Sequence, residues 1–283
     1  MLAVHNVGFL TFAQNTSKVD YLRLAYLQAM NIKSVMPGFA YAVVVDSNTA
    51  EQITDNHRRA FDHIIELIED YNTEGSGWLL ANECQAYDLT PFDETIKLES
   101  DLLFTRSIAH WLDAFRIKDI VLSYGCRDYT GQLSSNRDNR RLFDDNDLPD
   151  TYNGLMYFRR SETAQQFFAI AKTINQNWSA VRDQILKNCR EDYPSTDVLY
   201  AVAAQVLGRE LCTLPSVDFI NFTHMKPNIQ NWHNVEHWTE MIMNEHAGDM
   251  IRINNLNQYH PVHYYDKHYA SDELIKYYEQ RVF

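Results

Sequence analysis

The stretch LESDLLF at residues 98–104 decides how the chain is interpreted, because it places two carboxylates inside an otherwise apolar run. The β-branched residues before it, Thr95 and Ile96, are typical of a strand. Side chains two positions apart on a strand point to the same side, so Glu99 and Asp101 are predicted to converge. Two such anions repel each other unless a cation or a proton lies between them. The pattern favours a hard divalent cation, Mg2+ or Mn2+, and a solvated turn is the alternative for an isolated acidic pair.

The composition is typical of a globular protein that buries a large core. Of its 283 residues, 45% are hydrophobic and 13% aromatic, which suits one large α/β domain or a domain with a smaller appendage. No apolar run reaches membrane length, and no basic segment followed by an apolar one begins the chain. The four cysteines form no CxxC pair, so neither a zinc site nor a disulfide framework is predicted. We expect a soluble cytoplasmic protein that is not bound to a membrane; the sequence does not specify an oligomeric state.

The net charge of -13 argues against a generally basic surface for nucleic acid. A local basic groove remains compatible with this charge, because a local field and a net charge are different quantities. Five arginines are the candidates for such a groove: Arg137, Arg140, Arg141, Arg159 and Arg160. Ordinary solvated loop charges are the alternative.

The N-terminal part of the chain predicts a β-α-β unit. Residues 6–13 and 39–45 are apolar runs typical of strands, and residues 20–30 between them keep helical spacing. Such a unit predicts a parallel sheet with its ligand crevice at the carboxyl ends of the strands. Three polar residues that follow these strands would face the crevice: Gln14, Asn15 and Asp46. The sequence contains neither a glycine-rich dinucleotide fingerprint nor a P-loop.

Later segments continue the alternation of strands and helices. The spacing predicts helices at residues 51–70 and 107–115, strands at 119–124 and 151–158, and helices after Ser161 and from Thr196. Residues 125–149 are polar, and an irregular segment of this length is typical of a lid, a binding loop or a plain surface loop. Asp197, in the first turn of the last helix, either stabilises the helix N-terminus or projects into a pocket.

A second group of chemically active residues lies far downstream. Residues 219–222 are typical of a strand, which would deliver His224 to a strand end, the same type of location as that of Glu99 and Asp101. Neutral imidazole is a good ligand for Mn2+, and Lys226 is a point charge suited to a phosphate. Two carboxylates, one imidazole and one ammonium group would together suit a metal-bound diphosphate.

The order of these elements resembles the nucleotide-sugar-dependent glycosyltransferases of the GT-A fold, particularly the glycogenin-like retaining group. Residues 96–104 resemble that group's Asp-x-Asp strand, with Glu in place of the first Asp. Residues 152–159 resemble its strand that begins Asn-(Ser/Ala)-Gly. Residues 223–227 resemble its late His-x-x-x-x-Lys-Pro-Trp motif, with shorter spacing and no Trp directly after Pro. The Asn-rich and Tyr-rich sequence also resembles glycosyltransferase-like proteins of tailed bacteriophages, without a diagnostic motif; such an origin would imply the host cytoplasm.

The resemblance implies an α/β fold with a mixed, mainly parallel sheet flanked by helices. This GT-A domain would cover residues 1–232, and a helical, aromatic-rich appendage packed on it would cover residues 233–283. The donor substrate would be a nucleoside-diphosphate sugar, with Mn2+ or Mg2+ held against both phosphates by Glu99, Asp101 and His224. The ion would neutralise charge that develops on the leaving diphosphate, and Lys226 would add to this effect.

The remaining contacts implied by the resemblance surround this ion. Four residues would contact the nucleoside: Phe12, Gln14, Asn15 and Asp46. Asn153 and Gly154 would line the sugar pocket, and Asp197 would orient the donor sugar or the acceptor hydroxyl. The loop at residues 125–149 would close over the donor and exclude water, which competes as an acceptor.

The C-terminal fifty residues have no counterpart in the resemblance and are rich in aromatic and imidazole side chains. They form either an appendage packed on the main domain or an acceptor platform on which sugars or extruded bases stack. The phage resemblance would make the acceptor a hydroxymethylated, or already glycosylated, pyrimidine in DNA. A saccharide, protein or small-molecule acceptor is the alternative. A different metal-dependent nucleotide enzyme, such as a nucleotidyltransferase or phosphohydrolase, and a degenerate binding module are further alternatives.

Overall fold

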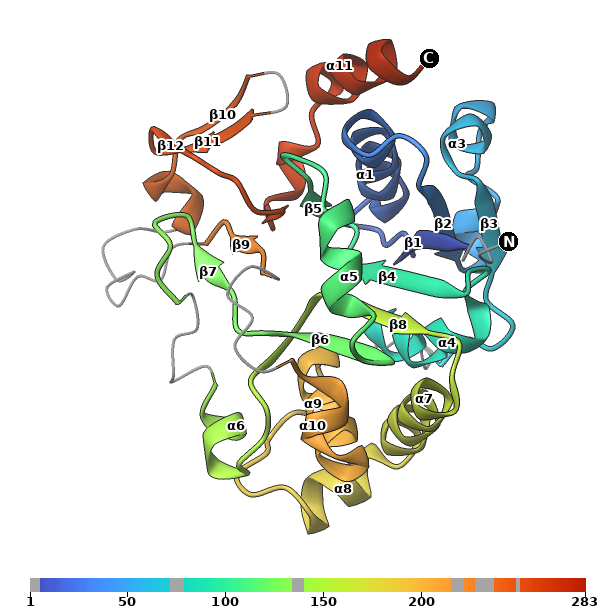
Figure 1. The fold of residues 1–283 in the computed structure, drawn as a ribbon, viewed down its shortest axis with the longest axis vertical. Coiled ribbons are helices and arrows are strands. Elements are labelled where there is room, and N and C mark those ends of the chain that lie inside the picture. Colours follow the sequence, from blue (N-terminus) through green and yellow to red (C-terminus); the bar gives the residue numbers. More distant parts are fainter. Residues whose placement is uncertain (1–5, 72–78, 134–139, 215–220, 227–236, 248–249) are drawn as a thin grey trace.

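The computed structural model describes residues 6–71, 79–133, 140–214, 221–226, 237–247 and 250–283. Its centre is a six-stranded sheet (Figure 1). In spatial order, the strands are β3 (His63–Glu66), β2 (Ala40–Val45), β1 (Val7–Phe12), β4 (Glu94–Leu98), β8 (Thr151–Arg159) and β6 (Ile120–Tyr124). The first four are parallel to one another, and β8 runs antiparallel to both β4 and β6. The predicted class, α/β with a mixed and mainly parallel sheet, is confirmed.

Helices cover both faces of this sheet, and its inner strands are accordingly buried along almost their whole length. Phe9 of β1 packs in one core cluster with residues of α1 (Tyr21–Val35) and α11 (Asp272–Val282). The next residue, Leu10, packs on the opposite face with α7 (Glu162–Gln176) and α9 (Thr196–Leu207). Successive residues of a strand therefore pack into two separate cores, because their side chains point to opposite faces of the sheet.

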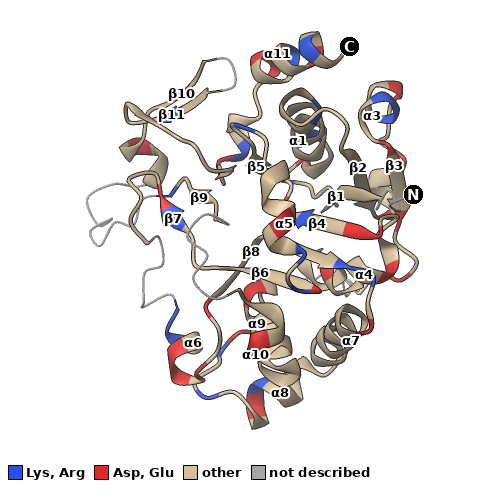
Figure 2. Ribbon diagram, viewed as in Figure 1, with Lys and Arg blue, Asp and Glu red and all other residues tan. Residues whose placement is uncertain are grey.

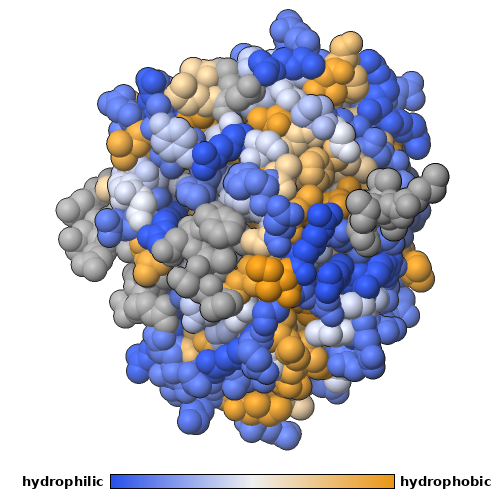
Figure 3. Space-filling view, in the orientation of Figure 1, coloured by the Kyte–Doolittle hydropathy of each residue, from blue (hydrophilic) through white to orange (hydrophobic). Residues whose placement is uncertain are grey.

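Shorter helices complete the layers. They are α2 (Ser47–Ala50), α3 (Asp55–Ala60), η1 (Leu79–Gln85), α4 (Ala86–Leu89), η2 (Ala109–Trp111), α5 (Leu112–Phe115), α6 (Arg141–Asp145), α8 (Trp178–Gln184), α10 (Arg209–Cys212), η4 (Trp238–Met241) and η5 (Lys267–Tyr269). Within the described residues, no helix has the length and apolar character needed to cross a bilayer. On the face drawn in Figure 3, hydrophilic residues predominate and hydrophobic ones form separate patches.

Local sequence signals fix the helix ends. Ser161 accepts a hydrogen bond from the backbone of Ala164 and begins α7, and Ser195 caps α9 in the same way. Helix α9 ends at Gly208, whose φ of 119° lies in a region that disfavours other residues. The helices predicted from these positions are confirmed.

The predicted helix at residues 51–70 is wrong in its second half. Helix α3 ends at Ala60, and residues 63–66 form the edge strand β3, which pairs parallel to β2. Ile64 and Ile65 point to opposite faces and pack against the two different cores. Their β-branched side chains suit this extended conformation, although their spacing from Ile68 also fits a helix.

The sequence predicted one continuous strand that carries Glu99 and Asp101, but the two residues lie outside the strands. Strand β4 ends at Leu98, and the chain turns out of the central sheet before β5 (Leu102–Leu103). The Gln28 side chain of α1 holds this turn, because its Nε2 donates to the carbonyls of Glu99 and Leu102 at 2.7 Å each. The two carboxylates therefore lie in a tethered turn between two sheets.

The second sheet joins distant parts of the chain. Its strand order is β5, β13 (Val262–His263), β9 (Thr223–His224) and β7 (Arg127–Asp128). Strand β13 lies between β5, to which it is antiparallel, and β9, to which it is parallel. The C-terminal part of the chain thus supplies the neighbour of the strand that follows Asp101.

The sequence predicted a helical C-terminal appendage, but this segment also contains strands. It contains β13 and a three-stranded sheet of β10 (Asn244–Ala247), β11 (Met250–Ile253) and β12 (Leu256–Asn257). Helix α11 then packs beside α1 (Figure 1). The predicted domain boundary at residue 232 and the strand start at 219–220 lie outside the described residues, so both stay predictions.

Candidate functional site

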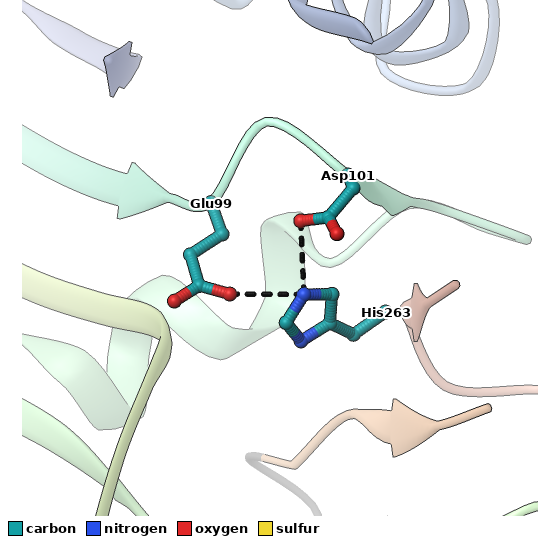
Figure 4. Close-up of side chains that lie close together, drawn as sticks. All are labelled: Glu99, Asp101 and His263. Carbon is teal, nitrogen blue, oxygen red and sulfur yellow. Dashed lines mark ion pairs between the residues drawn. The ribbon is translucent and has the colours of Figure 1, made fainter. Parts of the chain in front are cut away.

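Two carboxylates and an imidazole meet in the turn after β4. Nε2 of His263 lies 2.9 Å from Oε2 of Glu99 and 2.9 Å from Oδ1 of Asp101 (Figure 4). Asp101 and His263 are buried, whereas Glu99 is partly exposed. Among the residues that the structure describes, this is the one group of three acidic, His or Cys side chains close enough to hold a metal ion.

The electrostatics of this cluster favour a positive charge between its two carboxylates. Burial opposes a charge on His263, but Asp101 and Glu99 outweigh burial and raise the pKa of His263 to about 9. Burial also opposes the charge on Asp101, but His263 and Lys267 overcome it and hold the pKa of Asp101 far below its usual range. At neutral pH a proton on Nε2 therefore lies between the two carboxylates. Two carboxylates and an imidazole are also a donor set suited to Mn2+ or Mg2+, so the residues fit the ion that the sequence implies.

One ammonium group contacts the carboxylates, and a second lies over the neighbouring Tyr265 ring. Lys267 forms an ion pair with Oδ2 of Asp101. Nζ of Lys226 lies 4.5 Å from the centre of the Tyr265 ring, and burial together with Lys267 lowers the pKa of Lys226. Lys226 was predicted from the sequence as a phosphate-binding residue, and its role stays a prediction; Lys267 was not predicted.

The cluster opens into a pocket of about 310 Å³ at the carboxyl ends of β1 and β4. Phe12, Leu79 and Leu80 supply apolar lining, and the tyrosines Tyr21 and Tyr265 also line the pocket. The polar lining consists of Gln14, Thr16, Glu83, Glu99, Ser100, Asp101, His263 and Lys267. The pocket thus combines apolar and aromatic side chains with the charged groups of the cluster, which suits a ligand with an aromatic group and an anionic group.

The predicted nucleoside contacts divide into two pairs. Phe12 and Gln14 line the pocket, and the buried Nε2 of Gln14 has no hydrogen-bond partner among the described residues. Asn15 instead accepts a hydrogen bond from the backbone of Leu22 at 2.8 Å, and Asp46 caps α2. The structure gives Asn15 and Asp46 local structural roles outside the pocket lining, and their contact with a nucleoside stays a prediction.

Asn153 connects the cluster with a buried ion pair. Its Oδ1 accepts a hydrogen bond from Nζ of Lys97 at 2.8 Å. Its Nδ2 lies 2.6 Å from Oε2 of Glu83 and 3.4 Å from Oε1 of Glu99. The adjacent Gly154 accepts a hydrogen bond from the backbone N–H of Glu99. Asn153 therefore ties β8 to the turn that carries the carboxylates.

Gly154 must be a glycine for a packing reason. A Cβ at this position would lie 2.7 Å from Cζ of Phe222, which is closer than such atoms approach one another. The Phe222 ring covers the backbone of β8 at this point. The Asn-Gly pair singled out in the sequence thus combines a polar network with a close approach of the backbone.

Asp197 lies beside this network, at the start of α9. Its Oδ1 accepts a hydrogen bond from the backbone N–H of Asn153 at 2.7 Å, and its Oδ2 forms a 3.0 Å ion pair with Arg140. Burial raises the pKa of Asp197 to about 6, although Arg140 acts in the opposite direction. Asp197 therefore anchors Asn153, and its contact with a substrate stays a prediction.

His224, predicted as the third metal ligand, is not part of the three-residue group. It lies on β9 in register with His263 of β13, and the two ring centres are 5.9 Å apart. Burial lowers the pKa of His224 well below its usual range, so its imidazole is neutral. Because β13 lies between β9 and β5, the imidazole that meets Asp101 is that of His263. A ligand role for His224 stays a prediction.

Tyr265 holds the His263 ring in place. The two rings stack with their centres 3.8 Å apart at an angle of 24°. Nδ1 of His263 is buried without a hydrogen-bond partner among the described residues, so the usual second hydrogen bond of a ligating histidine is not available to orient the ring. Tyr265 itself has a φ of 55°, a strained conformation for a tyrosine. Stacking therefore acts together with the two ion pairs at Nε2 to orient this ring.

No model of a known protein family matches the sequence, and no curated protein matches it. Solved structures that resemble the chain include the bifunctional glycosyltransferase WbbM, at 11% identity and a TM-score of 0.49 over 85% of this chain and 44% of that chain. The galactosyltransferase LgtC, solved with donor and acceptor sugar analogues, has 11% identity and a TM-score of 0.49 over 74% and 73% of the two chains. Mouse xyloside xylosyltransferase 1 has 10% identity and a TM-score of 0.49 over 83% and 91%. The chain spans less than half of the length of WbbM.

Proposed function

We propose that this chain is a metal-dependent glycosyltransferase of the GT-A type, which transfers a sugar from a nucleoside-diphosphate sugar to an acceptor hydroxyl. The observation that carries the proposal is the convergence of Glu99, Asp101 and His263 at the charged end of the pocket. Parallel α/β sheets bind ligands outside the carboxyl ends of their strands, which is where this cluster lies.

The charges of the site match a diphosphate. Glu99, Asp101 and His263 would hold Mn2+ or Mg2+, with the two carboxylates balancing its two charges. Lys226 and Lys267 then remain to neutralise the phosphates, for which an ammonium group is a suitable point charge. When bound, the ion would stabilise the negative charge that develops on the leaving diphosphate.

The chain's own residues would position the rest of the donor. Phe12 and Gln14 lie at the pocket wall that we assign to the nucleoside. Asn153 is hydrogen-bonded to Glu99, so we assign the sugar to the side of the cluster that faces β8, with Asp197 holding Asn153 in place. Membership of the glycogenin-like retaining group is carried over from the sequence resemblance, and the sugar is either a hexose or a pentose.

For the acceptor, we favour a hydroxyl of a saccharide or a protein over one in phage DNA. The sequence made Arg140 a candidate for a basic surface groove. Arg140 is instead buried in ion pairs with Asp150 and Asp197, so it does not belong to such a groove. Arg159 pairs with Asp119. Acidic and basic residues are interspersed over the ribbon (Figure 2). Arg137 lies outside the described residues. The paired arginines leave the proposal of a phage DNA-modifying enzyme without support from the site.

The test is a thermal-shift panel of nucleotide sugars with and without Mn2+. A ligand present at about 100 times its Kd stabilises the protein by about 2.7 kcal/mol, which corresponds to roughly 4–5 °C for a chain of this size. We expect such a shift only with Mn2+ and a nucleotide sugar together, and we expect Asp101→Ala to abolish it. Asp62→Ala is a matched control, because Asp62 is an ion-paired carboxylate at the amino end of β3, and it is not among the residues that line the pocket. A panel without any Mn2+-dependent shift would reject the proposed function.

A further inference from the structure

A third carboxylate, that of Glu83, lines the same pocket and has one oxygen available to a ligand. Glu83 comes from η1, and its side chain is only 6% exposed. Its Oε2 is occupied by Nζ of Lys97 and by Nδ2 of Asn153. Its Oε1 has no hydrogen bond within the described residues, and it is not among the fully buried unpartnered atoms. The anchored carboxylate therefore presents one acceptor oxygen to the pocket.

The anchoring of Glu83 is unusually firm. The Lys97 side chain is completely buried, and an isolated ammonium group would be costly in that position. Tyr200 donates a hydrogen bond from its hydroxyl to the Glu83 carbonyl at 3.0 Å. Lys97 and Asn153 thus hold the side chain of Glu83, and Tyr200 holds its backbone. A fixed carboxylate in a pocket is preorganised for a ligand, because little freedom remains to be lost on binding.

Glu83 lies next to the proposed metal site. Nδ2 of Asn153 contacts the carboxylates of both Glu83 and Glu99, so the two carboxylates are separated only by the side-chain amide of Asn153. In a nucleoside-diphosphate sugar, the sugar is attached directly to the phosphate that the metal site would hold. The sugar ring therefore has Glu83 within reach.

We propose that Glu83 binds the donor sugar and selects a neutral sugar rich in hydroxyl groups over a sugar that carries a carboxylate. This inference rests on the proposed function. Oε1 accepts hydrogen bonds from sugar hydroxyls, and such bonds to a charged acceptor are stronger than neutral ones. A uronic acid would bring a second anion toward Glu83 and Glu99 and would be repelled.

The test uses donors that differ only at one carbon of the sugar. Binding of UDP, UDP-glucose and UDP-glucuronate in the presence of Mn2+ is measured by calorimetry, with GDP, GDP-mannose and GDP-mannuronate as the parallel set for a guanine-specific site. The wild type should prefer the neutral sugar over the uronate by roughly tenfold or more. Glu83→Gln should reduce this preference to about threefold or less, while the affinity for the nucleoside diphosphate alone stays within about twofold.

Two further variants separate recognition from folding. Glu83→Gln combined with Lys97→Met removes both charges of the buried pair and leaves no unpaired charge. This double variant should fold, and its preference for the neutral sugar over the uronate should be reduced as in Glu83→Gln. Glu94→Gln is the matched control, because Glu94 is also a buried, ion-paired carboxylate but pairs with Arg116 at the opposite end of β4. Its preference should equal that of the wild type.

Two results would overturn the inference while leaving the proposed function intact. One is an unchanged preference in both Glu83 variants. The other is an equal loss of affinity for the nucleoside diphosphate and for its sugar conjugate, which would indicate a purely structural role. A wild-type protein without a Mn2+-dependent shift for any nucleotide sugar of the thermal-shift panel would instead reject the proposed function, and the inference with it.

Discussion

The raised pKa of His263 gives a quantitative prediction about the stability of the metal-free protein. Its folded-state pKa of about 9 exceeds the ordinary 6.5, so the folded protein binds this proton more tightly than the unfolded chain does. The resulting stabilisation is fully present below pH 6.5 and is lost as the pH rises through 9. A difference of roughly 2.5 pKa units corresponds to about 3 kcal/mol. Because the side chain is only 3% exposed, solvent screens little of this energy.

The perturbation that isolates this effect is His263→Gln, which removes the titrating group. Urea unfolding would be measured with EDTA from about pH 6 to about pH 10 for the wild type and the variant. We expect the wild type to be more stable by about 3 kcal/mol at the acidic end, and we expect the difference to shrink as the pH rises through 9. A difference that stays constant over this range would refute the reasoning, because it would show that the proton on His263 does not link the two carboxylates.

Three further predictions concern individual side chains of the site. His263→Ala should weaken Mn2+ binding, measured by electron paramagnetic resonance, by roughly tenfold or more, whereas His224→Ala should leave it nearly unchanged; the reverse order would exchange their roles. Tyr265→Ala should also weaken Mn2+ binding by roughly tenfold, and Tyr265→Phe should restore it, since stacking needs only the ring; equal losses in both variants would exclude stacking. Gly154→Ala should lower the free energy of unfolding by about 1–3 kcal/mol, because its Cβ would meet the Phe222 ring, and an unchanged urea midpoint would contradict this packing.

Sequence patterns predicted the parts of the site that depend on local structure. The apolar strand before Glu99 indicated where β4 would end, and the β-α-β start indicated which end of the sheet would carry the ligand pocket. Glu99 and Asp101 do converge, although the tethered turn brings them together and the predicted strand does not. Phe12 and Gln14 line the pocket for the same topological reason.

The parts that were missed depend on long-range pairing. Strand β13 has two residues, too few to show an alternating pattern, and nothing local indicates that it inserts between β5 and β9. The sequence pointed to His224, on the neighbouring strand, whose ligand role stays a prediction, and it gave no local signal for His263. Lys97 was the one available signal for Glu83, because a lysine inside an apolar strand requires a buried partner. The identity of that partner follows only from the folded structure.

The most direct test of the central claim is a crystal structure with Mn2+ and the nucleoside diphosphate that gives the largest thermal shift, recorded at the manganese absorption edge. We expect one anomalous peak at about 2.0–2.6 Å from ligand atoms of Glu99, Asp101 and His263, with both phosphates against it. An ordered diphosphate without this peak, or a manganese ion held by other residues, would contradict the account.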